Sequence, residues 1–109
     1  MKRGDVVIVS SQGDCGKPRP AVIVQADFVT SHVESVIVCL MTGTAREIEM
    51  ARIPVPPTPE NGLRQVTFLM VEKIMTFPEH KISKIIGKVE PDILTRLDRT
   101  LTIVLGLAE

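Results

Sequence analysis

The first half of the chain alternates between short apolar runs rich in β-branched residues and breaks made of Gly, Pro, Ser or Asp. Three such runs occupy residues 6–10, 21–25 and 36–40. Runs of this length and composition are typical of buried strands and are too short for helices. We therefore expect three strands in this half, with a helical turn or two between the second and the third.

The second half of the chain continues the strand pattern, and near the C-terminus the spacing of its apolar residues changes to that of a helix. Residues 65–71 and 81–89 are apolar enough for two further strands. Residues 53–59 hold four prolines, which cannot donate to a sheet and therefore suit an edge strand or a crossing loop. Asn61-Gly62 is a turn signal. We expect the chain to return into the sheet after it.

A C-terminal amphipathic helix is predicted after the last strand. Pro91 stands where a first helical residue belongs. Apolar residues then recur at spacings of three and four, as on one face of a helix, at Leu94, Leu97, Leu101, Val104 and Leu105. We expect this face to pack on the sheet. With 109 residues, the chain has room for one domain, residues 1–109, of mainly β class.

Composition narrows the kinds of partner. Thirteen Lys and Arg balance thirteen Asp and Glu, and 44% of residues are hydrophobic, so the chain is neither disordered nor a basic wrapper of nucleic acid. Any polyanion must meet a local basic patch. The short apolar runs and the lack of a leader predict a soluble, cytoplasmic protein without a membrane segment. Cys15 and Cys39 fit no metal motif and are expected as free thiols.

The chain has no phosphate-binding glycine loop, H-E-x-x-H motif or G-x-S-x-G motif. The candidate functional side chains that remain lie in the loop of residues 13–20. Arg19 lies between two prolines at the start of a strand, where its guanidinium is suited to hold a phosphate through two parallel bonds. Composition alone favours an ordinary solvated loop. Thr42 and Thr44 follow the strand at residues 36–40, where hydroxyls usually serve turns. Spacing alone does not establish that Arg19 and Thr42 are neighbours.

Several segments in order resemble the MazF/PemK toxins, the RNA-cleaving halves of toxin-antitoxin pairs. The most specific are Gly-Lys-Pro-Arg-Pro at residues 16–20 and the strand ending in Thr42. The remaining matches lie at residues 2–9, 61–63, 71–76 and 86–89. The resemblance spans nearly the whole chain.

The resemblance implies a small SH3-like β-barrel with a C-terminal α-helix, a homodimer, and an endoribonuclease that uses no metal and no cofactor. Carried over residue by residue, Arg19 and Thr42 are the catalytic pair. The positions implied to bind substrate are Asp14, Lys17, Thr44, Glu72 and Lys73. Asp14 replaces a glutamate that is usual in the family. For Glu72 and Lys73, an ordinary ion pair at a strand end is the alternative.

The implied reaction is cleavage of single-stranded RNA by attack of a 2′-hydroxyl on the adjacent phosphate. A fixed guanidinium and a hydroxyl would stabilise the charge that builds on the phosphoryl oxygens. With three Phe and no Trp or Tyr, base stacking is a small source of affinity, so selectivity must come from polar loop contacts. The implied protein partner is an antitoxin, expected to be acidic and partly disordered.

Two other readings stay open. In the first reading, the chain is a family member that binds RNA or protein without cutting RNA. Met75, which stands where the family often has an arginine, favours this reading. Alternatively, it is a same-fold gyrase poison like CcdB. That class ends in Trp-Gly-Ile, whereas this chain ends Gly-Leu-Ala-Glu at residues 106–109.

Overall fold

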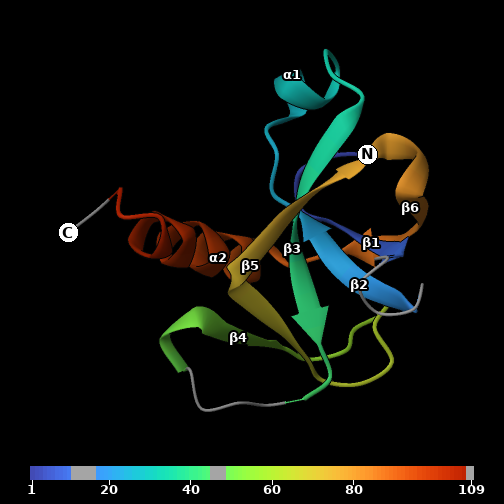
Figure 1. Cartoon of the computed structure of the whole chain (residues 1–109). Coiled ribbons are helices and arrows are strands. Elements are labelled where there is room, and N and C mark those ends of the chain that lie inside the picture. The colour runs from blue at the N-terminus through green and yellow to red at the C-terminus, as the bar shows by residue number, and fades with distance from the viewer. Residues whose placement is uncertain (11–16, 45–48, 108–109) are drawn as a thin grey trace.

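The computed structural model describes residues 1–10, 17–44 and 49–107, so Asp14 and Cys15 lie outside the described residues. Six strands and two α-helices make up the fold (Figure 1). The strands are β1 (Asp5–Ser10), β2 (Pro18–Ile23), β3 (Ser35–Thr42), β4 (Arg52–Val55), β5 (Thr67–Pro78) and β6 (Ile82–Lys88). The helices are α1 (Asp27–Thr30) and α2 (Pro91–Val104), with short 3₁₀ turns η2 (Glu49–Ala51) and η3 (Glu79–Lys81).

The strands form one sheet in the order β4-β5-β3-β2-β1-β6, and each pairing is antiparallel. The predicted mainly β class with a C-terminal helix is confirmed. Within the described ranges the two edge strands, β4 and β6, do not pair, so the sheet is an open, curved form of the expected barrel. The proline-rich segment supplies edge strand β4, where Pro54 removes a donor at little cost.

The central strands are apolar on both faces because a core lies on each side of them. The first core contains Val22 and Cys39 and is closed by Leu97 of α2. The second contains Ala21 and Leu40, the neighbours of those residues along β2 and β3. Successive residues of a strand point to opposite faces. The continuous apolar runs in the sequence therefore reflect burial on both faces.

Curvature of the sheet encloses the second core. Phe77, near the end of β5, and Ile82, at the start of β6, both pack into it. These strands are far apart in the sheet order, so the sheet has to curl for both to reach one cluster. The second core lies on the face of the sheet opposite the one that α2 covers, and we call this side the second-core face.

Strand β5 is longer than the predicted strand at residues 65–71, since it continues to Pro78. It bends on the way: Cys39 of β3 faces Ile74, but Met41 faces Leu69, so β5 carries extra residues between these pairs. Figure 1 shows the change of direction midway along β5. Residues 72–76, in the bend and beyond it, are polar or partly exposed, so the apolar pattern did not reveal this part of the strand.

Helix α2 begins at Pro91 as predicted and buries Leu97 against β4 and β5. Its last turn does not follow the prediction, because Val104 and Leu105 are 39% and 51% exposed. In Figure 1 the C-terminal end of α2 projects away from the sheet, so no sheet surface is available to cover it. None of the helices in the part of the chain that the structure describes is long and apolar enough to cross a membrane.

The predicted turn at Asn61-Gly62 anchors a loop to β6. Asn61 is fully buried, donates to the Pro56 carbonyl over 2.8 Å and accepts the backbone N–H groups of Thr58 and Leu63 over 3.0 Å each. Gly62 has φ +72°, and a Cβ there would lie 2.1 Å from the Ile86 carbonyl oxygen. The turn needs glycine for both reasons.

Gly62→Ala is expected to destabilise the fold far more than Gly106→Ala. Both glycines have φ +72°, but a Cβ at Gly106 meets nothing within 4 Å. The control therefore carries only the left-handed strain of roughly 1–2 kcal/mol, whereas Gly62→Ala adds a clash with backbone. Thermal unfolding measures the difference, at about 4–8 °C per kcal/mol for a domain of nearly this size. Equal losses of Tm would contradict the close approach of Gly62 to β6.

Candidate functional site

Strand alternation puts Arg19 and Thr42 on one face of the sheet. Ala21 pairs with Leu40, Val22 with Cys39 and Ile23 with Val38. Arg19 lies two residues before Ala21 in β2, and Thr42 lies two residues after Leu40 in β3. Because side chains two positions apart in a strand share a face, both project from the face that holds Ala21 and Leu40.

Residues of the neighbouring strands extend this pair into a row on the second-core face. Arg19 pairs with Val9 of β1, and Thr42 pairs with Phe68 of β5. Val9 belongs to the second core, which fixes the row on that face, opposite to α2. Both Arg19 and Thr42 are partly buried, so packing restricts their side chains while leaving them a solvent-facing part.

The Thr42 hydroxyl is held by a local bond at the strand end. It accepts the backbone N–H of Thr44 over 3.2 Å, and Thr44 itself is exposed. That bond uses an oxygen lone pair, so the hydroxyl proton can still be donated to a ligand. A guanidinium and a donating hydroxyl that project from one face are suited to bind a phosphate whose oxygens gain negative charge.

The residues predicted to bind substrate are spread around this row. Lys17 precedes β2 directly and is exposed, so it lies near Arg19 along the chain. Glu72 and Lys73 lie in the bend of β5, four and five residues beyond Phe68. The bend sets residues 70–73 of β5 against the single residue between Cys39 and Met41 of β3. Met75, which stands where the resemblance expects an arginine, is 42% exposed.

Glu72 is held by a partner that the sequence did not reveal. Arg52 donates from Nη2 to Oε2 of Glu72 over 2.7 Å, and the arginine side chain is only 8% exposed. Arg52 pairs with Met70 of β5, which packs into the second core, so Arg52 lies on the second-core face. The bond connects edge strand β4 to the bend of β5. In the sequence, Arg52 is only a single cation before the proline-rich segment, so its pairing with Glu72 could not be predicted.

No set of three His, Cys, Asp or Glu side chains that could hold a metal ion occurs within residues 1–10, 17–44 and 49–107.

Comparison with known sequences identifies relatives over the full chain. Residues 2–105 match the model of the PemK-like, MazF-like toxins of type II toxin-antitoxin systems. A protein of Mycolicibacterium smegmatis described as a probable endoribonuclease MazF is 35% identical over 109 residues, with 99% of each chain covered.

Solved structures share the fold at lower identity. A mycobacterial endoribonuclease in complex with its cognate antitoxin aligns with TM-score 0.84 and 22% identity, covering 100% of this chain and 98% of that one. The Mycobacterium tuberculosis toxin MazF-mt6 gives TM-score 0.82 and 23% identity, covering 96% and 99%. A MazE-MazF structure from Deinococcus radiodurans aligns with TM-score 0.79 and 16% identity, covering 99% of this chain and 97% of that one. At these identities the comparison concerns the fold.

Cys39 is expected to be chemically silent in the folded protein. It is a free, buried thiol whose Sγ lies 3.4 Å from the Met70 carbonyl oxygen. Burial, together with the Glu72 carboxylate, raises the pKa of Cys39 to about 12. Because the unfolded pKa is lower, at 9.0, this group stabilises the fold fully below that value and loses its contribution as pH rises toward about 12.

Alkylation of a Cys15→Ser variant tests this expectation. At about pH 8, iodoacetamide should leave the native protein unmodified and add one group after unfolding in guanidinium, as read by intact mass. Cys39→Ser in the Cys15-containing chain is the matched control. Rapid labelling of native Cys39 would contradict its burial.

Proposed function

Because this chain belongs to the PemK-like, MazF-like toxins of type II toxin-antitoxin systems, we propose that it is a sequence-selective endoribonuclease acting on single-stranded RNA. The relative at 35% identity carries the name of a probable endoribonuclease. The observation that supports the proposal most is the β2–β3 register, because strand alternation from it puts Arg19 and Thr42 on one face at the same end of the two strands. A guanidinium and a hydroxyl on one face can both donate to one phosphate group.

In this proposal the RNA supplies its own nucleophile. The 2′-hydroxyl attacks the adjacent phosphorus, the P–O bond to the 5′-oxygen breaks, and the products are a 2′,3′-cyclic phosphate and a 5′-hydroxyl end. Arg19 and Thr42 donate to the phosphoryl oxygens, whose negative charge grows toward the transition state. No cofactor or metal enters a step of this scheme.

Glu72 and Lys73 are proposed to contact a nucleotide beyond the scissile phosphate, together with Lys17, Thr44 and Asp14 nearer to it. The ion pair with Arg52 supports this role for Glu72, since a neutralised carboxylate repels RNA less and can still accept from base amines. Asp14 lies outside the described residues.

We further propose that an antitoxin neutralises this toxin and that the active form is a homodimer. One structural neighbour is an endoribonuclease in complex with its cognate antitoxin. The dimer is supported by the exposed apolar end of the chain, where Ile103, Leu105 and Leu107 are 61%, 51% and 76% exposed. A cluster of this kind favours burial against a second protein surface.

Arg19→Ala and Thr42→Val are each expected to lower the cleavage rate by about 10²–10³, the usual loss when one transition-state donor is removed. The assay is gel-resolved cleavage of a mixed-sequence RNA in the presence of a chelator. Arg19→Lys keeps the charge but removes the two-bond geometry, and should also be strongly impaired. Arg99→Ala, on the exposed side of α2, is the matched control. Full cleavage by Arg19→Ala would overturn the assignment.

Ile103→Asp is expected to shift the protein from dimer to monomer, because it places a charge in the exposed apolar end of α2. Ile103 is exposed in the single chain, so the substitution should leave the fold of the monomer intact. Light scattering after size exclusion reads the mass, with Arg96→Asp on the polar side of α2 as control. If Ile103→Asp still has the mass of a dimer, the dimer interface does not include the end of α2.

A further inference from the structure

Arg52 is a buried cation that binds one carboxylate. Its side chain is only 8% exposed, and its Nη2 donates to Oε2 of Glu72 over 2.7 Å. Its Nε is also buried and has no hydrogen-bond partner among the described residues. Desolvation of a guanidinium offsets most of the attraction within a buried ion pair, and a buried N–H without a partner adds to that cost. The main effect of the pair is therefore a carboxylate held in one place, rather than a large gain in stability.

The pair lies on the same face of the sheet as the proposed catalytic row. Thr42 pairs with Phe68 of β5, and Phe68 pairs with Pro54 of β4. Arg52 precedes Pro54 by two residues, so both side chains project from this face. The Glu72 carboxylate is bound to Arg52 and therefore lies next along the face from that row. RNA that is held at the row has a fixed carboxylate beside its path.

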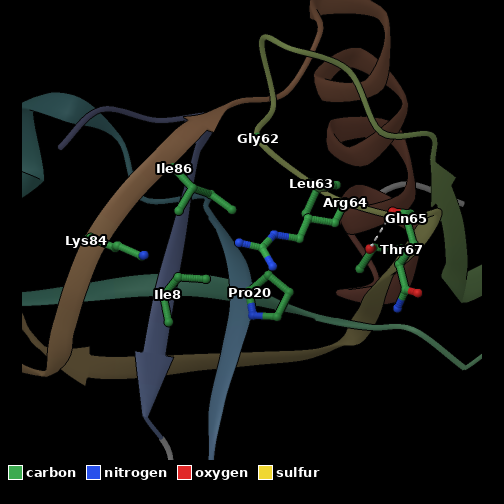
Figure 2. A pocket seen from close by; sticks show the side chains of 9 residues that line it. All are labelled: Ile8, Pro20, Gly62, Leu63, Arg64, Gln65, Thr67, Lys84 and Ile86. Atoms are coloured by element: carbon green, nitrogen blue, oxygen red, sulfur yellow. Dashed lines mark hydrogen bonds between the residues drawn. The ribbon is translucent and has the colours of Figure 1, made fainter.

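Arg52 differs from cations that the fold leaves open to solvent. Figure 2 shows Arg64 and Lys84 reaching into a pocket of about 510 Å³, which Pro20 also lines, on the face of β2 away from the proposed catalytic row. Both side chains are exposed, and no Asp or Glu lines that pocket. Arg52 is enclosed and its charge is matched, so it does not offer a phosphate the open positive charge that an exposed cation offers. Any effect of Arg52 on RNA therefore passes through Glu72.

The bond to Arg52 leaves Glu72 with one oxygen to offer. Oε2 is taken by the guanidinium, and Oε1 makes no hydrogen bond within the described residues. The Glu72 side chain is 28% exposed, so a ligand can reach it. An ionised carboxylate only accepts hydrogen bonds. Cytosine presents an amine at ring position 4, where uracil presents a carbonyl oxygen, so a fixed carboxylate oxygen attracts the first base and repels the second.

We propose that Arg52 is a positioning residue that makes Glu72 selective for an amine-bearing base, cytosine rather than uracil, at one nucleotide near the scissile phosphate. This rests on the proposed function, in which RNA is bound over this face. Arg52 holds Oε2, so Oε1 is presented to the base in a single orientation. Its charge also neutralises the carboxylate, which lowers the repulsion between Glu72 and the RNA backbone.

The base preference at each position of the cut sequence tests the proposal. A pool of random-sequence RNA is cut in the presence of a chelator, and the new ends are sequenced. At one position, wild-type protein should cut RNA with cytosine about tenfold faster than RNA with uracil, as expected for one hydrogen bond to a charged group. Arg52→Met should bring that ratio close to one, and Arg52→Lys, which keeps the charge and one donor, should retain part of it. Arg64→Met removes an exposed cation instead and should leave the ratio unchanged.

Glu72→Gln distinguishes positioning from a purely structural role. An amide has a single acceptor oxygen, which Arg52 should bind, so the amide N–H groups should face the RNA and the preference should reverse to uracil. When Arg52→Met is combined with Glu72→Gln, nothing fixes the amide and the preference should disappear. A loosened structure slows the cutting of every sequence alike, so it cannot reverse a ratio between two bases.

The outcomes separate this inference from the proposed function. The inference is wrong if wild-type protein nowhere prefers cytosine to uracil, if Arg52→Met keeps the wild-type ratio, or if Glu72→Gln keeps the preference for cytosine. If thermal unfolding shows that Arg52→Met does not fold, Glu72→Gln decides the question, because it retains Arg52. Wild-type protein that does not cut RNA would overturn the proposed function together with this inference, whereas cutting with an unchanged ratio would overturn this inference alone.

Discussion

The register between β2 and β3 is the constraint on which the rest of this molecule depends. A slip of one residue would exchange the faces of every side chain in β2, turning Arg19 toward the α2 side and Pro20 toward the second-core face. The two cores prevent such a slip. Val22 and Cys39 pack with Leu97, while Ala21 and Leu40 pack on the other side, so any slip would bury the wrong volumes in both cores at once.

The same alternation divides the chemistry between two faces. The second-core face carries Arg19 and Thr42, and Arg52 on the same face pairs with Glu72 in the bend of β5. The other face carries the pocket under Arg64 and Lys84. Consecutive residues Arg19 and Pro20 thus serve different surfaces of one strand. A strand is a rigid element, so both surfaces are held in fixed relation without a dedicated scaffold for each.

Local charge, rather than total charge, sets what this protein can attract. Positive and negative residues balance over the chain, and a neutral surface has little long-range pull on a polyanion. Cations that lie close together over an apolar surface produce a strong local positive potential, even though the protein has no net positive charge. Arg52 illustrates the opposite use, because its buried charge is matched by Glu72 at 2.7 Å and therefore stabilises a bend instead of attracting a ligand.

The sequence by itself determined the elements whose signals are local. Pro91 and the spacing of Leu94, Leu97 and Leu101 predicted α2, Asn61-Gly62 predicted its turn, and the prolines of residues 53–59 predicted an edge. It also indicated Arg19 and Thr42, through a resemblance carried by short motifs. Only the tertiary structure decided that these two share a face, that β5 continues through its bend, and that the end of α2 stays exposed. It also decided that Arg52 binds Glu72 and that Arg64 and Lys84 line one pocket. These outcomes depend on sheet order, curvature and contacts between residues about twenty positions apart, and no local pattern in the chain encodes them.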